Sequence, residues 1–124
     1  FEKYAKEELK ETDQHKIEKY KNAPFRAPMI IILISTITDH PKVPEIEQVM
    51  STAAAAQNIL LALNALKFGG MWRTGALALN AKISNHLGLD ENQKVLGYLY
   101  VGTTEGSEKR IPELNPDDFI TKWE

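Results

Sequence analysis

The residues best suited to hold a ligand lie together in one segment, Phe68-Gly69-Gly70-Met71-Trp72-Arg73-Thr74-Gly75. Gly69 and Gly70 leave a stretch of backbone without side chains, so a large flat group can approach it closely. Trp72 offers an aromatic face, Arg73 a planar cation with several N–H donors, and Thr74 a hydroxyl. This set suits a ligand with a flat ring and an anionic tail, a description that flavin mononucleotide (FMN) fits.

The same segment has a purely structural interpretation. It follows a long apolar pattern that predicts a helix, and Gly69 could end that helix in a left-handed turn. Trp72 would then fill the core, and Arg73 would form a surface salt bridge with an acidic residue of the C-terminal tail. The residue types alone leave both interpretations open.

Other kinds of chemistry find little support in the sequence. His15, His40 and His86 stand singly, without the spacing of metal ligands, so we expect no metal site. The chain has no cysteine, which excludes disulfides and thiol catalysis. It also lacks a nucleophile elbow and a phosphate-binding loop of the P-loop type. We therefore expect no catalytic side chain and a cofactor that carries the chemistry.

Length and composition predict one globular domain over residues 1–124, with 43% apolar and 26% charged residues. A net charge of −2 provides no basic surface for nucleic acid. The apolar runs 29–34 and 59–63 are too short to span a membrane, and the first residues do not form a signal peptide. We expect a cytoplasmic protein that binds neither nucleic acid nor membrane. Because a helical pattern is under way at Phe1 without a cap, we also expect the domain to lack its N-terminal part.

Periodicity and turn residues predict the main elements. Prolines and glycines separate runs with helical or strand periodicity. Asn80 and Gly88 are suited to cap a short helix between them. The predicted helices are 1–21, 45–68 and 81–87, and Thr12-Asp13 could break the first of them or start a second turn. The predicted core strands are 29–34, buried on both faces, and 94–102.

The helix 45–68 is apolar on nearly all sides, which is typical of a helix buried all round. A chain of this size cannot surround it alone, so we expect a second subunit to cover part of it. Ala53-Ala54-Ala55-Ala56 permits close approach of another helix. In the tail, Phe119, Ile120 and Trp123 are too apolar to remain in water, and we expect them to dock, with a partner subunit as one candidate surface.

Several motifs in fixed order carry a resemblance to a known family. Together they cover nearly the whole chain, most weakly at its ends. The motifs are Asn22-Ala23-Pro24-Phe25-Arg26-Ala27-Pro28, His40-Pro41-Lys42-Val43-Pro44, Glu47-Gln48, Gly69-Gly70-Met71-Trp72-Arg73-Thr74-Gly75-Ala76-Leu77 and Gly97-Tyr98-Leu99-Tyr100-Val101-Gly102-Thr103. In this arrangement the chain resembles the nitroreductase family of flavin enzymes, and most closely its small YdjA-type subgroup.

The resemblance implies an α+β fold: a mixed sheet flanked by helices, with a long buried central helix, in an intertwined homodimer with flavins at the interface. It implies that Gly69 and Gly70 lie near the ring of FMN. Trp72, Arg73 and Thr74 would contact the cofactor, Arg73 through its phosphate. The nicotinamide donor would lie near the end of the long helix, at Ala62, Leu63, Asn64, Ala65, Leu66 and Lys67.

The activity that the resemblance implies is hydride transfer from NADH or NADPH, through the flavin, to a small electrophilic acceptor such as a nitroaromatic or a quinone. The family's N-terminal Arg-Arg-Ser type motif, which grips the flavin phosphate and ribityl, has no counterpart in this sequence. The alternative is therefore a non-catalytic remnant that only binds flavin or dimerises. The residues identify neither the acceptor nor the choice between NADH and NADPH.

Overall fold

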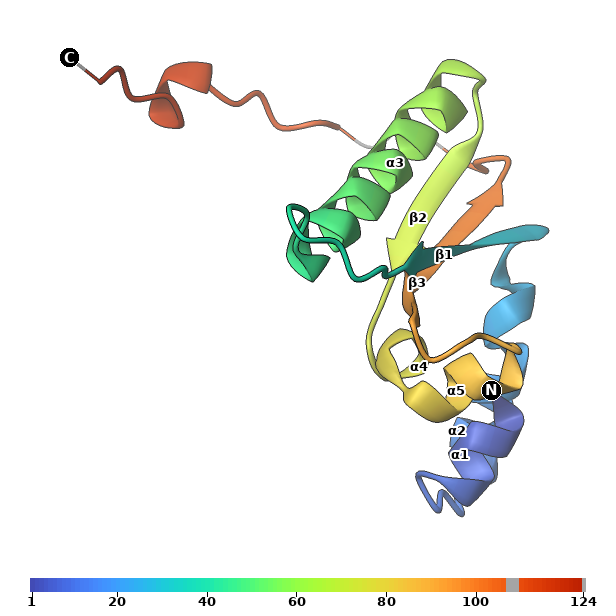
Figure 1. Cartoon of the computed structure of the whole chain (residues 1–124). Coiled ribbons are helices and arrows are strands. Elements are labelled where there is room, and N and C mark those ends of the chain that lie inside the picture. Colours follow the sequence, from blue (N-terminus) through green and yellow to red (C-terminus); the bar gives the residue numbers. More distant parts are fainter. Residues whose placement is uncertain (107–109, 124) are drawn as a thin grey trace.

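The computed structural model describes residues 1–106 and 110–123, and it has an α+β fold as predicted. A three-stranded sheet carries the long helix α3 on one face and the shorter helices on the other (Figure 1). The strands are β1 (Met29–Thr36), β2 (Gly69–Arg73) and β3 (Gln93–Gly102). The helices are α1 (Glu2–Glu7), α2 (Gln14–Asn22), α3 (Glu45–Ala65), α4 (Ala76–Leu79) and α5 (Ala81–His86), with 3-10 turns at Ala23–Arg26 and Pro116–Asp118.

Strand β3 lies at the centre of the sheet, in the order β1-β3-β2, and pairs antiparallel with both neighbours. The predicted mixed sheet is therefore wrong for the described strands. β1 and β2 run parallel to each other, but β3 separates them, so no parallel pair forms. The central position also explains why Val95 and the run 97–101 are buried, whereas the two edge strands are only partly covered.

Strand β1 packs against an apolar cluster on each face, as its near-continuous apolar sequence predicts, although most of its residues are only partly buried. Ile31 and Leu33 pack in the cluster beneath α3. Ile30 and Ile32 pack in the cluster on the opposite face, which includes Tyr98 of β3. Alternation of side chains along a strand sends neighbours to opposite faces, so a strand with both faces covered needs apolar residues at every position.

Helix α3 begins where predicted, after Pro44, but ends at Ala65, three residues before the predicted end. Lys67 adopts a left-handed conformation with φ 65°, and the Phe68 amide donates to the Leu63 carbonyl (2.8 Å). Lys67 thus takes the place at the helix end that the structural interpretation gave to Gly69. Gly69 is instead the first residue of β2, so this part of that interpretation is wrong.

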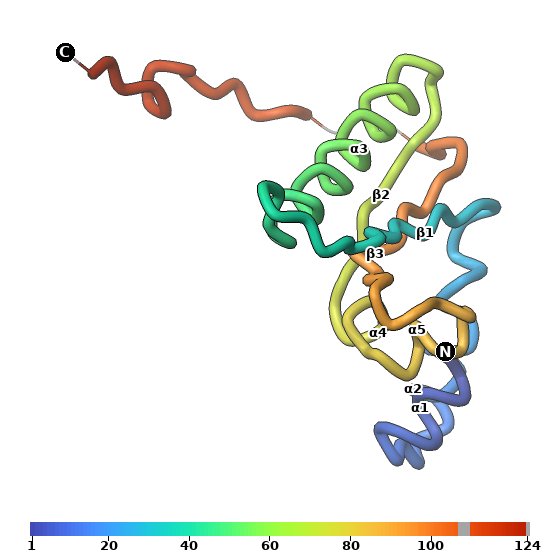
Figure 2. The backbone as a smooth tube through the Cα atoms, viewed as in Figure 1, coloured from blue at the N-terminus to red at the C-terminus, as the bar shows by residue number. Residues whose placement is uncertain are grey.

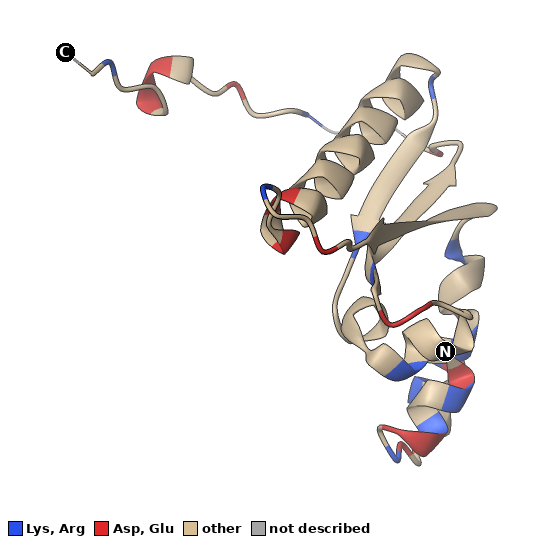
Figure 3. Cartoon of the chain, viewed as in Figure 1, with Lys and Arg blue, Asp and Glu red and all other residues tan. Residues whose placement is uncertain are grey.

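In this chain α3 is covered on one face only. Ala56 is its single buried residue, and Ile59, Leu60 and Leu63 pack beside it against the sheet. This corrects the expectation of a helix buried on all sides, as far as one chain is concerned. The opposite face is exposed, and between Gln48 and Leu66 it carries no charge, whereas the N-terminal helices are densely charged (Figure 3).

Local capping signals in the sequence are confirmed. Asn80 accepts a hydrogen bond from the Lys82 amide (2.9 Å) at the start of α5, and Gly88 follows the helix with φ 74°. The predicted N-terminal helix is two helices, because Asp13 accepts from the His15 amide (2.9 Å) and starts α2 anew. No helix among the described residues has the length and apolar character needed to cross a bilayer.

The C-terminal tail runs away from the body of the chain (Figure 2). Phe119, Ile120 and Trp123 are 73%, 65% and 95% exposed. The expected docking of these side chains therefore does not occur within a single chain.

Candidate functional site

The candidate site is built on β2, an edge strand between α3 and α4. In the antiparallel register Trp72 lies opposite Leu99, and Arg73 opposite Tyr98. Paired residues place their side chains on the same face of a sheet. Trp72 therefore faces α3 with Leu99, whereas Arg73 shares the other face with Tyr98.

Gly70 faces the long helix. A Cβ at this position would lie 2.6 Å from Leu60 Cδ2 and 3.1 Å from Leu63 Cδ1, so the absence of a side chain lets α3 pack directly on the strand. This face of the glycine backbone is filled by leucine side chains, and a flat ligand cannot lie there. A flavin ring near Gly70, as the resemblance implies, would therefore have to approach this residue from another side.

The part of β2 that a ligand can contact is its outer edge. β2 pairs only with β3 among the described strands, so its other side carries unpaired backbone N–H and C=O groups. Gly69 and Gly70 contribute no side chains that would shield these groups. A planar heterocycle with donors and acceptors on its rim could hydrogen-bond to such an edge.

The Trp72 side chain belongs to the core. It is half-buried against the cluster beneath α3, and its indole Nε1 donates to the Leu96 carbonyl (3.3 Å). The indole lies directly over Gly97 of β3, where any Cβ would overlap it. The structural interpretation therefore accounts for the side chain of Trp72, and a cofactor contact is left to its backbone.

Arg73 and Thr74 are both exposed at the end of β2. Within residues 1–106 and 110–123, Arg73 has no ion-pair partner, so the alternative of a salt bridge with the tail is not found among the described acids. Gly75 follows with φ 90° and opens α4. A guanidinium that has no ion-pair partner among these residues and stands next to a hydroxyl is suited to bind an anion.

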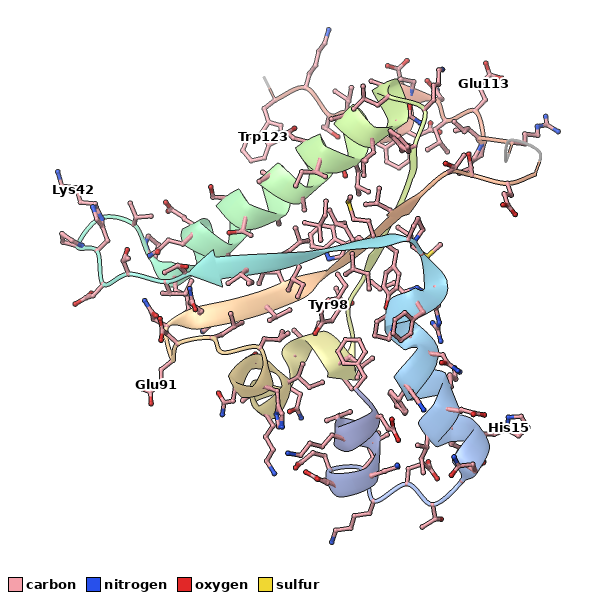
Figure 4. The ribbon with its side chains drawn as sticks, turned by 90° about the vertical axis from the view of Figure 1, so that its right-hand side faces the viewer. His15, Lys42, Glu91, Tyr98, Glu113 and Trp123 are labelled. Atoms are coloured by element: carbon pink, nitrogen blue, oxygen red, sulfur yellow. The ribbon has the colours of Figure 1, made fainter. Side chains whose placement is uncertain are left out.

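Tyr98, on the same face as Arg73, remains neutral. Burial raises its pKa to about 12, and its hydroxyl donates to the Leu77 carbonyl (2.9 Å). Figure 4 shows Tyr98 on the side of the sheet turned toward α4 and the N-terminal helices. The phenol therefore adds no negative charge that would compete for Arg73, and it ties α4 to the sheet.

The residues predicted to lie near the nicotinamide donor are at the other end of β2. Leu63 faces the sheet, whereas Ala62, Asn64, Ala65, Leu66 and Lys67 are exposed. Gly69 and Arg73 are four residue steps apart along β2, and at a rise of about 3.3 Å per residue they lie roughly 13 Å from each other. The structure thus brings Arg73 and Thr74 together and places the segment 62–67 apart from them, along one strand edge.

A cavity of about 400 Å³ lies on the face of the sheet that carries Tyr98, between α1, α5 and β1. Its walls include Tyr4, Ile30, Ile83 and Tyr98, and the Lys82–Glu8 ion pair (2.6 Å) stands at its rim. None of the predicted site residues lines it. Tyr98, which pairs with Arg73 across the strands, is the residue that the cavity shares with the surroundings of the candidate site.

Sequence reasoning missed Gly97 as a residue of the site. It has φ 149°, and a Cβ there would lie 2.7 Å from the Arg73 carbonyl oxygen. Gly97 thus allows Trp72 and Arg73 to approach β3 closely. The available signal was a glycine inside an otherwise apolar strand, which often marks a close backbone approach.

Comparison with known proteins gives consistent matches. The family model described as "Nitroreductase family" matches residues 1–103. YdjA of Escherichia coli strain K12, which carries an NAD(P)H nitroreductase name, is 38% identical over 111 residues, covering 89% of this chain and 61% of YdjA. A Haemophilus influenzae protein with a similar name is 29% identical over 110 residues, covering 87% of this chain and 60% of its own length.

Solved structures show the same fold. A nitroreductase-like protein from Bacillus cereus aligns with a TM-score of 0.72 at 19% identity, covering 92% of this chain and 62% of that one. A Bacteroides fragilis nitroreductase with bound FMN aligns with a TM-score of 0.60 at 24% identity, covering 94% and 64%. The chain thus spans about three fifths of the length of the relatives that it matches. With a family model over 103 residues and a relative at 38% identity, this chain belongs to the nitroreductase family.

Proposed function

We propose that the chain is a single nitroreductase-like domain, residues 1–124, of an FMN-dependent oxidoreductase that takes electrons from NADH or NADPH. The observation that carries this proposal is Arg73, which is exposed with Thr74 at the end of an edge strand and has no ion-pair partner among the described residues, in a member of this family. The NAD(P)H nitroreductase name of the Escherichia coli relative and the FMN bound by the Bacteroides fragilis structure support the choice of donor and cofactor.

The residues present fit an elongated anionic cofactor along β2. Arg73 would hold the phosphate through charge-assisted hydrogen bonds, and Thr74 would add a hydroxyl. The unpaired edge at Gly69 and Gly70 would hydrogen-bond the rim of the ring. When bound, FMN would supply hydride transfer between the nicotinamide donor and a small acceptor, for which we propose a nitroaromatic or a quinone. The exposed residues of the segment 62–67 would lie toward the donor.

We expect Arg73→Ala to weaken FMN binding by about 1.5–3 kcal/mol, the range for a hydrogen bond to a charged group. This corresponds to a dissociation constant raised roughly 10- to 150-fold. Arg73→Lys should restore only part of the loss, because an ammonium lacks the planar donor fork. Fluorescence titration with FMN measures the effect.

Arg26→Ala provides the matched control, since Arg26 is also exposed but lies on the 3-10 turn before β1. It should leave FMN affinity unchanged. Equal affinities of the Arg73→Ala variant and the unmodified chain would remove Arg73 from the site.

The second candidate function is a non-catalytic module that binds flavin or only dimerises. Absorbance spectra of the purified protein separate the candidates. A yellow protein whose flavin absorbance bleaches on addition of NADH or NADPH supports the oxidoreductase. A yellow protein that neither donor bleaches supports the flavin-binding module, and a colourless protein that takes up no FMN supports the dimerising one.

We also propose a homodimer formed through the exposed side of α3. Ile46, Met50, Ala54, Leu61 and Ala65 recur at helical spacing on the side opposite the sheet, and we call them the outer face of α3. Ile46, Met50 and Leu61 are about 60% exposed, at 58%, 61% and 59%. Ala54, at the middle of this face, leaves room for a second helix to cross closely.

Ala54→Glu should dissociate the homodimer, because it would bury an unpaired charge at the centre of the interface. Sedimentation velocity at micromolar concentration measures the change. Ala81→Glu is the matched control: Ala81 is exposed in the first turn of α5, where a carboxylate is tolerated well. A dimer that survives Ala54→Glu would contradict the proposed interface.

A further inference from the structure

The cavity between α1, α5 and β1 has the size and the lining of a site for a small organic molecule. Its volume is about 400 Å³, and ligand sites in proteins typically measure about 300–1,000 Å³. Tyr4, Ile83 and Tyr98 are buried on its walls. Ile30 and Ile32 of β1 add two further apolar side chains, on the side of the sheet that carries Tyr98 (Figure 4).

The interior of this cavity offers little to water. A buried water needs two to four polar partners. The Tyr98 hydroxyl already donates to the Leu77 carbonyl (2.9 Å). Within residues 1–106 and 110–123, every buried side-chain nitrogen or oxygen has a hydrogen-bond partner. An apolar ligand would therefore displace weakly held water and gain the free energy of burying apolar surface.

The charged side chains that line the cavity are paired with one another. Lys82 of α5 forms an ion pair with Glu8 (2.6 Å), and Lys3 forms one with Glu7 within α1 (3.9 Å). The imidazole Nδ1 of His86 lies 2.6 Å from the Lys82 carbonyl oxygen. A charged ligand would have to leave water without gaining a free counter-charge, which is unfavourable beside apolar walls. The pairing therefore favours a neutral ligand.

We propose that this cavity is a binding site for a neutral aromatic molecule of the size of a substituted naphthalene. Tyr4 and Tyr98 provide aromatic rings against which such a ligand can stack or pack edge to face. The inference goes beyond the proposed function. Neither Arg73 nor Thr74 lines the cavity, so a ligand there leaves the proposed contacts with the FMN phosphate free.

Two fluorescent probes that differ by one charged group test the proposal. N-phenyl-1-naphthylamine is neutral, and its fluorescence rises in an apolar environment. 8-Anilino-1-naphthalenesulfonate has the same rings and one sulfonate in addition. In titrations of the purified protein we expect saturable binding of the neutral probe. The sulfonate should bind at least about tenfold more weakly, because its charge would lose hydration without a free cation to pair with. An equal or higher affinity for the sulfonate would overturn the proposed ligand class.

Cavity-filling substitutions locate the bound probe. Leu87 lines the cavity and is 40% exposed, so a larger side chain is tolerated there. Leu87→Trp should weaken binding of the neutral probe at least about tenfold, because the indole takes up space that the ligand needs. Ile83→Trp fills the cavity more deeply and should have the same effect. Leu79→Trp is the matched control, since Leu79 is 73% exposed at the end of α4 and does not line the cavity.

Circular dichroism shows whether each variant is folded, and Leu87→Trp alone decides if Ile83→Trp does not fold. Unchanged affinity of a folded Leu87→Trp protein for the neutral probe would overturn the proposal. The probe would then bind elsewhere, for example to the exposed apolar side chains of the C-terminal tail.

The ion pair at the rim provides a test of the charge argument. Glu8→Gln leaves the Lys82 ammonium at the rim without its carboxylate partner. The sulfonate probe should then gain affinity, whereas the affinity of the neutral probe should stay the same. Glu91→Gln is the control, because Glu91 is exposed and does not line the cavity. An unchanged ratio of the two affinities in Glu8→Gln would contradict selection of a neutral ligand by paired charges.

FMN distinguishes this site from the proposed flavin site. The neutral probe should stay bound when FMN is added, and Arg73→Ala should not change its affinity. Displacement of the probe by FMN would overturn the proposal, because the cavity would then belong to the flavin site. A protein that binds the probe in the cavity but takes up no FMN would support this inference and refute the proposed cofactor alone.

Discussion

Gly97→Ala is expected to destabilise the protein by about 3 kcal/mol or more, the combined effect of backbone strain and overpacking. Gly97 is buried in the central strand with φ 149°, a conformation that residues with a Cβ rarely adopt. The added methyl would lie 2.7 Å from the Arg73 carbonyl oxygen and would overlap the Trp72 indole. Neither group can move easily, because the Arg73 carbonyl is part of the strand backbone and the Trp72 indole packs in the core.

Urea unfolding followed by circular dichroism measures this effect as a lower transition midpoint. Gly88→Ala is the matched control, since Gly88 also has a positive φ (74°) but no atom within 4 Å of the added Cβ. That variant should cost about 1 kcal/mol, the usual penalty for a side chain at a glycine position of this kind. Equal losses of stability for the two variants would mean that the close approach of Trp72 and Arg73 to β3 adds nothing to the effect of Gly97→Ala.

Gly70→Val is expected to destabilise the fold by about 1–3 kcal/mol, the usual range for overpacking a core. The first atom of the new side chain would lie 2.6 Å from Leu60 Cδ2, so either the Leu60 side chain or α3 itself would have to shift. If a flavin ring lay against Gly70, the same change would instead remove flavin binding and leave the apoprotein folded.

A double-mutant cycle with Leu60→Ala distinguishes the two possibilities. The smaller residue at position 60 makes room for valine, so the double variant should be more stable than the sum of the single changes predicts, a coupling typical of residues in contact. Additive losses would show that the two positions do not meet. Loss of FMN binding in a Gly70→Val protein of unchanged stability would restore the original hypothesis of a ring against the glycine face.

The family and the elements with local signals could be predicted from the sequence. The ordered motifs identified the nitroreductase family, which the family model over residues 1–103 confirms. The near-continuous apolar run from Met29 predicted β1, and the helical repeat from Glu45 predicted α3. Asn80 and Gly88 predicted the ends of α5. Such signals can be read from the sequence because the cap or the repeat acts between residues close together in the chain.

The secondary structure of the glycine-rich segment and the roles of its residues depend on contacts that form only in the folded chain. Gly69–Arg73 lacks strand periodicity and contains two glycines, yet it forms β2, because pairing with β3 and the close packing of α3 stabilise it. The same contacts show that Gly70 lets α3 pack on the strand and that Trp72 packs in the core. Arg73 has no ion-pair partner within residues 1–106 and 110–123. Which side of a strand is covered depends on residues distant in the sequence, such as Leu60 and Gly97. A local pattern can therefore indicate a ligand site, but only the assembled sheet and helix decide which of its residues are free to bind.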